Sequence, residues 1–105
     1  MTNDNERILC AAVWFQDIEI KKYVPIESRL PVNCDRGVVV CGHRHYQCLY
    51  TAVSITGLST HEMGEHIQGF LTNRNRFVDR EEGGLMHRAN GYKTQLDDLF
   101  SEDLY

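Results

Sequence analysis

The chain has 105 residues, of which 42% are hydrophobic and 25% charged, with a formal net charge of −4. This length suits one small domain with one core, and the charge content is too ordinary for a disordered chain. No apolar run approaches the roughly 18 residues of a membrane helix, and the polar start does not resemble a signal peptide. We therefore expect one cytoplasmic domain over residues 1–105, with flexible ends (1–6 and the last few residues) and four reduced cysteines.

The acidic residues are concentrated at the two ends of the chain. Six of the 15 lie there: Asp4, Glu6, Asp97, Asp98, Glu102 and Asp103. Nine acids and all 11 bases remain between them. A surplus of about two positive charges is too small for strong non-specific binding to a DNA or RNA polymer, which needs many phosphate contacts. It is compatible with one local site for an anion.

Two apolar runs are predicted to form buried strands. Ile8–Phe15 is unbroken and rich in Val, Trp and Phe, so we expect a strand buried on both faces. Val38–Cys41 is the second, and Gly42 ends it. Asp17–Val24 alternates between polar and apolar residues and is expected to continue or pair with the first strand. Trp14 is either a core residue, which we favour, or a ring on which a base stacks.

Two helices are expected after the second strand. The first begins near His43–His45, ends at Thr56–Gly57, and directs four residues to the core: Tyr46, Leu49, Tyr50 and Val53. The second begins at Ser59 or Thr60, since Ser59 and Glu62 have capping-box spacing. Its apolar stripe consists of Met63, Ile67 and Phe70, and Gly69 is expected to end it.

A third helix is predicted after a polar turn at Thr72–Arg76 and a short extended Phe77–Val78. It begins at the capping box Asp79–Glu82 and runs to about Ala89. Gly83-Gly84 indicates a close backbone contact or a weak helix, since each glycine costs about 1 kcal/mol relative to alanine.

The C-terminal tail is acidic and carries apolar anchors that are expected to dock on a neighbour: Leu99, Phe100, Leu104 and Tyr105. The order of the predicted elements favours an α+β fold, in which about three helices pack on a small antiparallel sheet.

Cysteines and histidines are crowded in one segment without forming a recognisable metal site. Four of them lie in eight residues: Cys41, His43, His45 and Cys48. So tight a run can rarely bring four ligands to one zinc ion. His61 and His66 are five residues apart, about 140° from the shared face that a metalloprotease helix requires. We therefore predict no metal and no cofactor.

No sequence pattern identifies a catalytic nucleophile. The chain has no Walker loop, dinucleotide-binding glycine motif or nucleophile elbow. Acid–base catalysis by a histidine and a carboxylate stays open, because any such pair could serve. The prediction is a protein without enzymatic activity.

The segment Gly69–Glu82, read as GFLTNRNRFVDREE, has the composition of a site for an anionic, ring-containing ligand. Arginine forks match phosphate oxygens, asparagine pairs with base edges, and aromatic rings cover base faces. We favour ligand contact for at least one of Arg74 and Arg76, core packing for the phenylalanines, and a structural role for Arg80.

Arg44 and His45 fall at the N-terminus of a predicted helix. Such an end attracts anions through its partial positive charge and free amides. The alternative, that both are solvated first-turn residues, stays open.

Three pieces of the second half resemble a group of small phage proteins: GHRH at Gly42–His45, GFLTNRNRFVDREE at Gly69–Glu82, and FSED at Phe100–Asp103. This pattern is similar to the first-described Thoeris anti-defence sponge family. The resemblance implies an oligomer that binds the cyclic ADP-ribose signals of bacterial immunity without cleaving them, and some members also hold cyclic oligonucleotides. Two positions depart from the pattern: Gly83-Gly84 replaces an acidic residue and alanine, and Gly91-Tyr92 replaces glycine-glutamine.

The first hypothesis is therefore a homo-oligomeric sponge in the cytoplasm of the infected host, with no membrane association. Six residues form its expected ligand site: Trp14, Arg44, His45, Phe70, Asn75 and Arg76. The two arginines would contact phosphates, the asparagine a base or ribose, and Phe70 or Trp14 a base face, in sites between subunits.

Two other functions stay open. An enzyme that hydrolyses the same ligand would use His43, His45 or His61. A small phage module that binds another protein would use the acidic tail.

Overall fold

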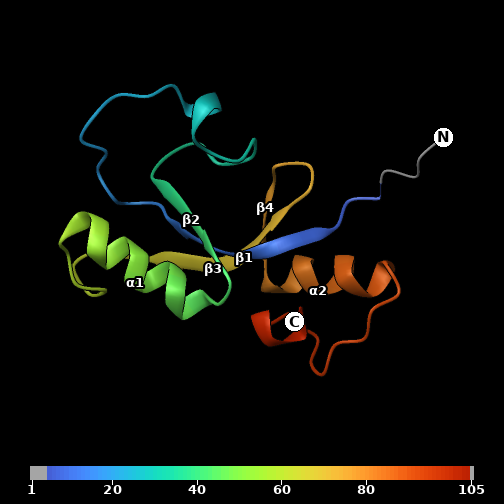
Figure 1. Ribbon diagram of the computed structural model, residues 1–105. Helices are drawn as coiled ribbons and strands as arrows, with labels where there is room; N and C mark the ends of the chain where they lie inside the picture. The colour runs from blue at the N-terminus through green and yellow to red at the C-terminus, as the bar shows by residue number, and fades with distance from the viewer. Residues whose placement is uncertain (1–4, 105) are drawn as a thin grey trace.

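A computed structural model describes residues 5–104 and shows a four-stranded antiparallel sheet in the order β2-β1-β3-β4 (Figure 1). The elements in chain order are β1 (Ile8–Phe15), η1 (Ile26–Ser28), β2 (Val38–Gly42), α1 (His45–Thr56), β3 (His66–Thr72), β4 (Phe77–Asp79), α2 (Arg80–Ala89) and η2 (Ser101–Asp103). The α+β class and the antiparallel sheet are confirmed. The described residues contain two α-helices instead of the three expected.

The central strand β1 is buried on both faces, as its unbroken apolar run predicts. One face, with Ala11, Val13 and Phe15, packs against α1, α2 and the described residues that follow α2, which we call the C-terminal segment. On the other face, Ala12 packs against Leu30 and further residues of the connection between β1 and β2. In Figure 1 both helices lie on one side of the sheet and this connection on the other.

The segment 17–24 is not a strand, so its predicted pairing with β1 is wrong. Both edges of β1 are already occupied, by β2 and by β3, which leaves no ladder hydrogen bonds for a third neighbour. Ile18 packs instead against the core beside α1.

The predicted second helix is instead strand β3, although its capping signal is real. Ser59 and Glu62 exchange the reciprocal hydrogen bonds of a capping box, at 2.9 and 3.1 Å, but they close only a turn. Gly64 then adopts a φ of 78°, which ends any helix there. The predicted stripe splits across the strand, because Phe70 faces the helices and Ile67 the opposite side.

The helix α1 exists where predicted, but only half of its predicted core face is correct. Leu49 and Val53 pack against the core, as expected, whereas the prediction is wrong for Tyr46 and Tyr50. The buried residues of the helix are His45, Cys48 and Ala52, whereas Tyr46 and Tyr50 are 58% and 66% exposed. The helix lies so close to β2 that a β-carbon added at Gly42 would stand 3.1 Å from the Cys48 sulfur. Small side chains are therefore needed on the inner face, and the tyrosines turn outward. Gly57 ends the helix in the left-handed region, as predicted.

The helix α2 begins at its predicted cap, since the Asp79 carboxylate accepts a hydrogen bond from the Glu82 amide at 2.8 Å. Of the two readings of Gly83-Gly84, the close contact is correct. A β-carbon at Gly83 would press on the Phe70 ring, and one at Gly84 would overlap the Asp97 carbonyl oxygen.

The C-terminal tail packs on its own chain. Leu99 is fully buried against Phe70 and Ala11, and its amide donates to the Arg80 carbonyl oxygen at 2.9 Å. The predicted docking of Leu99 on a neighbour is therefore wrong. Another predicted anchor, Tyr105, lies outside the described residues.

Candidate functional site

A cavity of about 330 Å³ opens on the helix side of the sheet, between the first turn of α1, the start of α2 and the C-terminal segment. Nine residues line it: Arg44, His45, Tyr46, Leu49, Gln68, Arg80, Phe100, Ser101 and Glu102. We call it the interhelical cavity. It brings together two arginines, two aromatic rings and a carboxylate.

Arg80 is the half-buried cation of the interhelical cavity. Its guanidinium donates to the Leu99 carbonyl oxygen at 3.0 Å and to the Gln68 side-chain oxygen at 2.5 Å. The Phe100 ring lies 4.4 Å from its central carbon, within the range of a cation–π contact. Burial lowers the pKa of Arg80, yet a guanidinium stays charged at neutral pH. The fold thus fixes a positive charge in this cavity.

His45 fixes the orientation of Arg80. Its Nε2 lies 2.8 Å from the Gly69 carbonyl oxygen, which can only accept, so Nε2 carries the proton. Its Nδ1 is then the acceptor that faces the Arg80 guanidinium at 3.3 Å. Burial is the main reason why the pKa of His45 is lowered, so the ring is neutral. With both nitrogens engaged, His45 positions Arg80 and has no free nitrogen to act as a base.

Arg44 is the N-cap residue of α1, which confirms that this helix starts near His43–His45. Its backbone amide donates to the Gln47 side-chain oxygen at 2.9 Å, and its guanidinium donates to the Ser101 carbonyl oxygen at 2.6 Å. Arg44 therefore joins the start of α1 to the C-terminal segment. The partial positive charge of this helix end adds to the two arginines.

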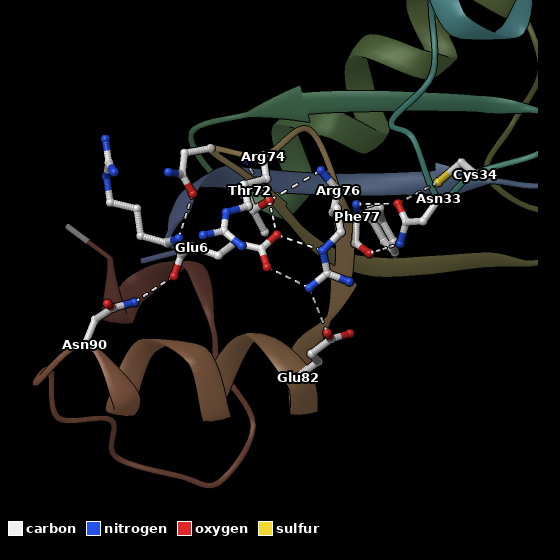
Figure 2. Close-up of polar contacts among 11 residues, drawn as sticks. Glu6, Asn33, Cys34, Thr72, Arg74, Arg76, Phe77, Glu82 and Asn90 are labelled. Carbon is white, nitrogen blue, oxygen red and sulfur yellow. Dashed lines mark hydrogen bonds and ion pairs between the residues drawn. The ribbon is translucent and has the colours of Figure 1, made fainter. Parts of the chain in front are cut away.

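Arg76 lies away from the interhelical cavity and is paired within its own chain. Its guanidinium donates one hydrogen bond to Glu6 Oε1 at 2.9 Å and one to Glu6 Oε2 at 2.7 Å, and it contacts the Glu82 carboxylate at 3.1 Å (Figure 2). Glu6 Oε2 also accepts a hydrogen bond from the Thr72 hydroxyl at 2.7 Å. This network ties the N-terminal segment to the β3–β4 hairpin and to α2.

The other predicted ligand residues are also dispersed. Asn75 shapes the hairpin turn with a φ of 57° and lines a cavity of about 270 Å³ on the opposite face. Trp14 lies on that face as well, where its indole donates to the Arg36 carbonyl oxygen at 2.8 Å and packs edge-on against Phe77. Phe70 is fully buried beneath the His45 ring. The structure therefore unites only Arg44, His45 and the underlying Phe70.

The Glu6–Arg76 pair predicts a component of acid stability. Hydrogen bonds from Arg76 hold the pKa of the Glu6 carboxyl below its ordinary value, so this stability is present above the unfolded pKa and lost as pH falls through the folded one. We expect Glu6→Gln to lower the free energy of unfolding by about 1 kcal/mol at neutral pH and by less near pH 3. Urea unfolding at both values checks this. Exposed Glu81→Gln is the matched control, and equal losses at the two pH values would contradict the prediction.

Sequence reasoning missed Arg80, Gln68, Phe100 and Glu102 as site residues. The signal that could have identified them was the set of three sequence pieces that resemble the sponge family. Gly42–His45 supplies Arg44 and His45, Gly69–Glu82 supplies Arg80, and Phe100–Asp103 supplies the aromatic and acidic rim. All three pieces meet at the interhelical cavity, although they lie far apart in the sequence.

The described residues contain no group of three or more His, Cys, Asp or Glu side chains that could hold a metal ion. Among residues 5–104, no helix is long and apolar enough to cross a membrane.

Comparison with curated proteins finds no match, and comparison with solved structures finds none either. A family model described as phage T4 y16D protein matches residues 7–105, which is nearly the whole chain. The chain therefore belongs to the phage T4 y16D protein family.

Proposed function

We propose that this phage protein is a sponge that binds a cyclic ADP-ribose-type or related cyclic nucleotide signal in the interhelical cavity and holds it without cleaving it. The observation that supports this is the convergence of the three sequence pieces that resemble the Thoeris anti-defence sponges. These pieces are far apart in the sequence, yet residues from all three line one polar cavity.

The lining of the interhelical cavity matches the parts of a nucleotide. Arg80 and Arg44 supply positive charge for phosphate oxygens, and both line the cavity at helix starts. The Phe100 and Tyr46 rings offer faces for a base. The Glu102 carboxylate is a suitable acceptor for ribose hydroxyls. His45 is neutral and both of its ring nitrogens are hydrogen-bonded, which supports binding without hydrolysis.

The cavity is small for a dinucleotide, which favours a site completed by a second copy of the chain. Pockets that bury such ligands range from about 300 to 1,000 Å³, and this one lies at the lower limit. Exposed Tyr46 and Tyr50 form an aromatic pair, 6.2 Å between ring centres, at its edge. In this proposal Trp14, Asn75 and Arg76 reach the ligand only across a contact between copies. Light scattering should give a mass above that of a monomer.

The function is tested by depletion and recovery of ligand. The protein is incubated with a cyclic ADP-ribose isomer or a cyclic oligonucleotide, filtered, and then heated. A sponge removes the ligand from the filtrate and releases it intact after denaturation, as read by chromatography. A cleaved product would identify an enzyme instead. Ligands that are never depleted would overturn nucleotide binding and leave a protein-binding module.

Arg44→Ala tests whether the interhelical cavity is the site. Loss of a charge-assisted contact should weaken ligand binding by about 1.5–3 kcal/mol, or roughly 10- to 150-fold. Calorimetric titration measures this, and a thermal melt confirms that the variant is folded. The control is Arg36→Ala, whose side chain is 59% exposed and lies outside this cavity. Equal affinity in wild type and Arg44→Ala would remove Arg44 from the site.

A further inference from the structure

Two thiols meet on the face of the sheet opposite the helices, away from the interhelical cavity. Cys41 on β2 lies opposite Ala12 on β1, and Cys10 precedes Ala12 by two residues. Side chains alternate along a strand, so Cys10 and Cys41 point to the same face as diagonal neighbours. Both cysteines are free thiols.

Reagents can reach this pair, unlike the other two cysteines. Cys41 is exposed and lines the cavity of about 270 Å³ beside Leu71, and Cys10 is half-buried. Cys34 and Cys48 are both buried, and burial raises the pKa of each to about 11. Only the first two combine access with a neighbouring thiol.

The interaction between the two thiols shifts their pKa values in opposite directions. The neighbouring Cys41 thiol favours a thiolate at Cys10 and lowers the pKa of Cys10 to about 7. The same interaction, together with burial, raises the pKa of Cys41. An accessible thiolate beside a second thiol is the arrangement found in cysteines that respond to oxidants.

We propose that Cys10 and Cys41 form an oxidation-sensitive dithiol site that reacts with hydroperoxides. The Cys10 sulfur attacks a peroxide oxygen, the O–O bond breaks, hydroxide leaves, and Cys10 becomes a sulfenic acid. The Cys41 sulfur then attacks the Cys10 sulfur, and the sulfenic oxygen leaves as water with the Cys41 proton. Overall, two thiols and hydrogen peroxide give one disulfide and two water molecules.

The disulfide would clamp the connection that covers this face of the sheet. Cys10 and Cys41 lie before and after the whole segment from Asp17 to Gly37, which includes the core residue Leu30. Diagonal neighbours are roughly 7–8 Å apart, so their α-carbons must approach by at least about 1 Å to reach disulfide geometry. Cys41 is the penultimate residue of the edge strand β2, where such a shift disturbs only one partner strand. Closing this loop restricts the unfolded chain, and the strain of the shift offsets part of that gain, so the melting temperature should rise by about 5 °C.

The test uses the whole, fully reduced protein and hydrogen peroxide as the probe. After brief oxidation, intact mass spectrometry should show the loss of two hydrogen atoms, and non-reducing peptide mapping should link Cys10 to Cys41. Dithiothreitol should reverse both the mass change and the thermal shift. Addition of oxygen alone, a link to Cys34 or Cys48, or a link between two chains would overturn the proposal.

Variants separate the roles of the two sulfurs. Cys41→Ser should stop the reaction at the Cys10 sulfenic acid, which dimedone traps, whereas Cys10→Ser should leave Cys41 unlabelled at the same dose. The matched control is Cys34→Ala/Cys48→Ala, which keeps the proposed pair and should still form the disulfide. Dimedone labelling of Cys41 in Cys10→Ser, equal to that of Cys10 in Cys41→Ser, would contradict the assigned order. Wild-type mapping decides the linkage even if a variant misfolds.

Discussion

Gly69→Ala should destabilise the protein by about 3 kcal/mol or more, because the new methyl group has no space. Gly69 lies in the middle of β3 opposite Asp79 on β4. A β-carbon there would overlap the backbone carbonyl oxygen of Val78 and meet the Phe77 ring at 2.8 Å. A backbone atom held in a sheet cannot rotate away, so the β3–β4 pairing must open. The Gly69 carbonyl oxygen would shift with it and weaken its bond to His45.

Urea denaturation at neutral pH measures this effect, and Gly57→Ala is the matched control. Gly57 faces open space but has a φ of 73°, so alanine there is strained without a clash. That strain should cost about 1 kcal/mol. A loss at Gly69 no larger than the loss at Gly57 would show that the sheet absorbs the methyl group and would refute the clash.

Arg80→Ala is expected to cost about 2–4 kcal/mol of stability and to abolish ligand binding. Removal of the guanidinium leaves the Leu99 carbonyl oxygen, the Gln68 side-chain oxygen and the His45 Nδ1 without their donor. It also removes the cation beneath the Phe100 ring. The C-terminal segment loses one of the bonds that hold it to α2, so the edge of the interhelical cavity should loosen.

Arg80→Lys distinguishes the charge of Arg80 from its geometry. Lysine keeps one positive charge but cannot direct a planar fork at three acceptors. We expect most of the loss of stability to persist, with ligand affinity lying between those of wild type and Arg80→Ala. Urea unfolding and calorimetric titration on the same samples separate the two effects. Wild-type stability in Arg80→Ala would show that the C-terminal segment is held by other contacts.

Elements with signals in neighbouring residues were predictable from the sequence. The apolar run gives β1 with its bounds, Gly57 gives the end of α1, and Asp79 gives the start of α2. In each case the cause is local: continuous hydrophobicity, a left-handed glycine, or a carboxylate that accepts from an amide. The error at Ser59–Glu62 has a local cause as well, because a capping box also closes an isolated turn, and only Gly64 shows that the helix does not continue.

The candidate site was predictable only in part. Arg44 and His45 were placed correctly at a helix start, which the apolar pattern and the preceding glycine indicate. Arg76 and Arg80 look alike in sequence, since both lie among polar residues close to acids. Their roles differ because of residues that are remote in the sequence. Glu6 pairs with Arg76, whereas the half-buried Arg80 is surrounded by residues from three separate segments.

By itself, the sequence determined the α+β class, the central buried strand, the polar turn at Thr72–Arg76, the cap of α2 and the three pieces that carry the resemblance to the sponges. The tertiary structure decided which face of α1 is buried, that residues 66–72 form a strand, and which arginine joins Arg44 and His45. The physical reason is that steric fit between elements and pairing of buried polar groups depend on residues distant in the chain. Gly42 against Cys48 excludes the tyrosines from the inner face, and β1 provides the edge that makes β3 a strand. The interhelical cavity exists only because the C-terminal segment returns to meet both helix starts.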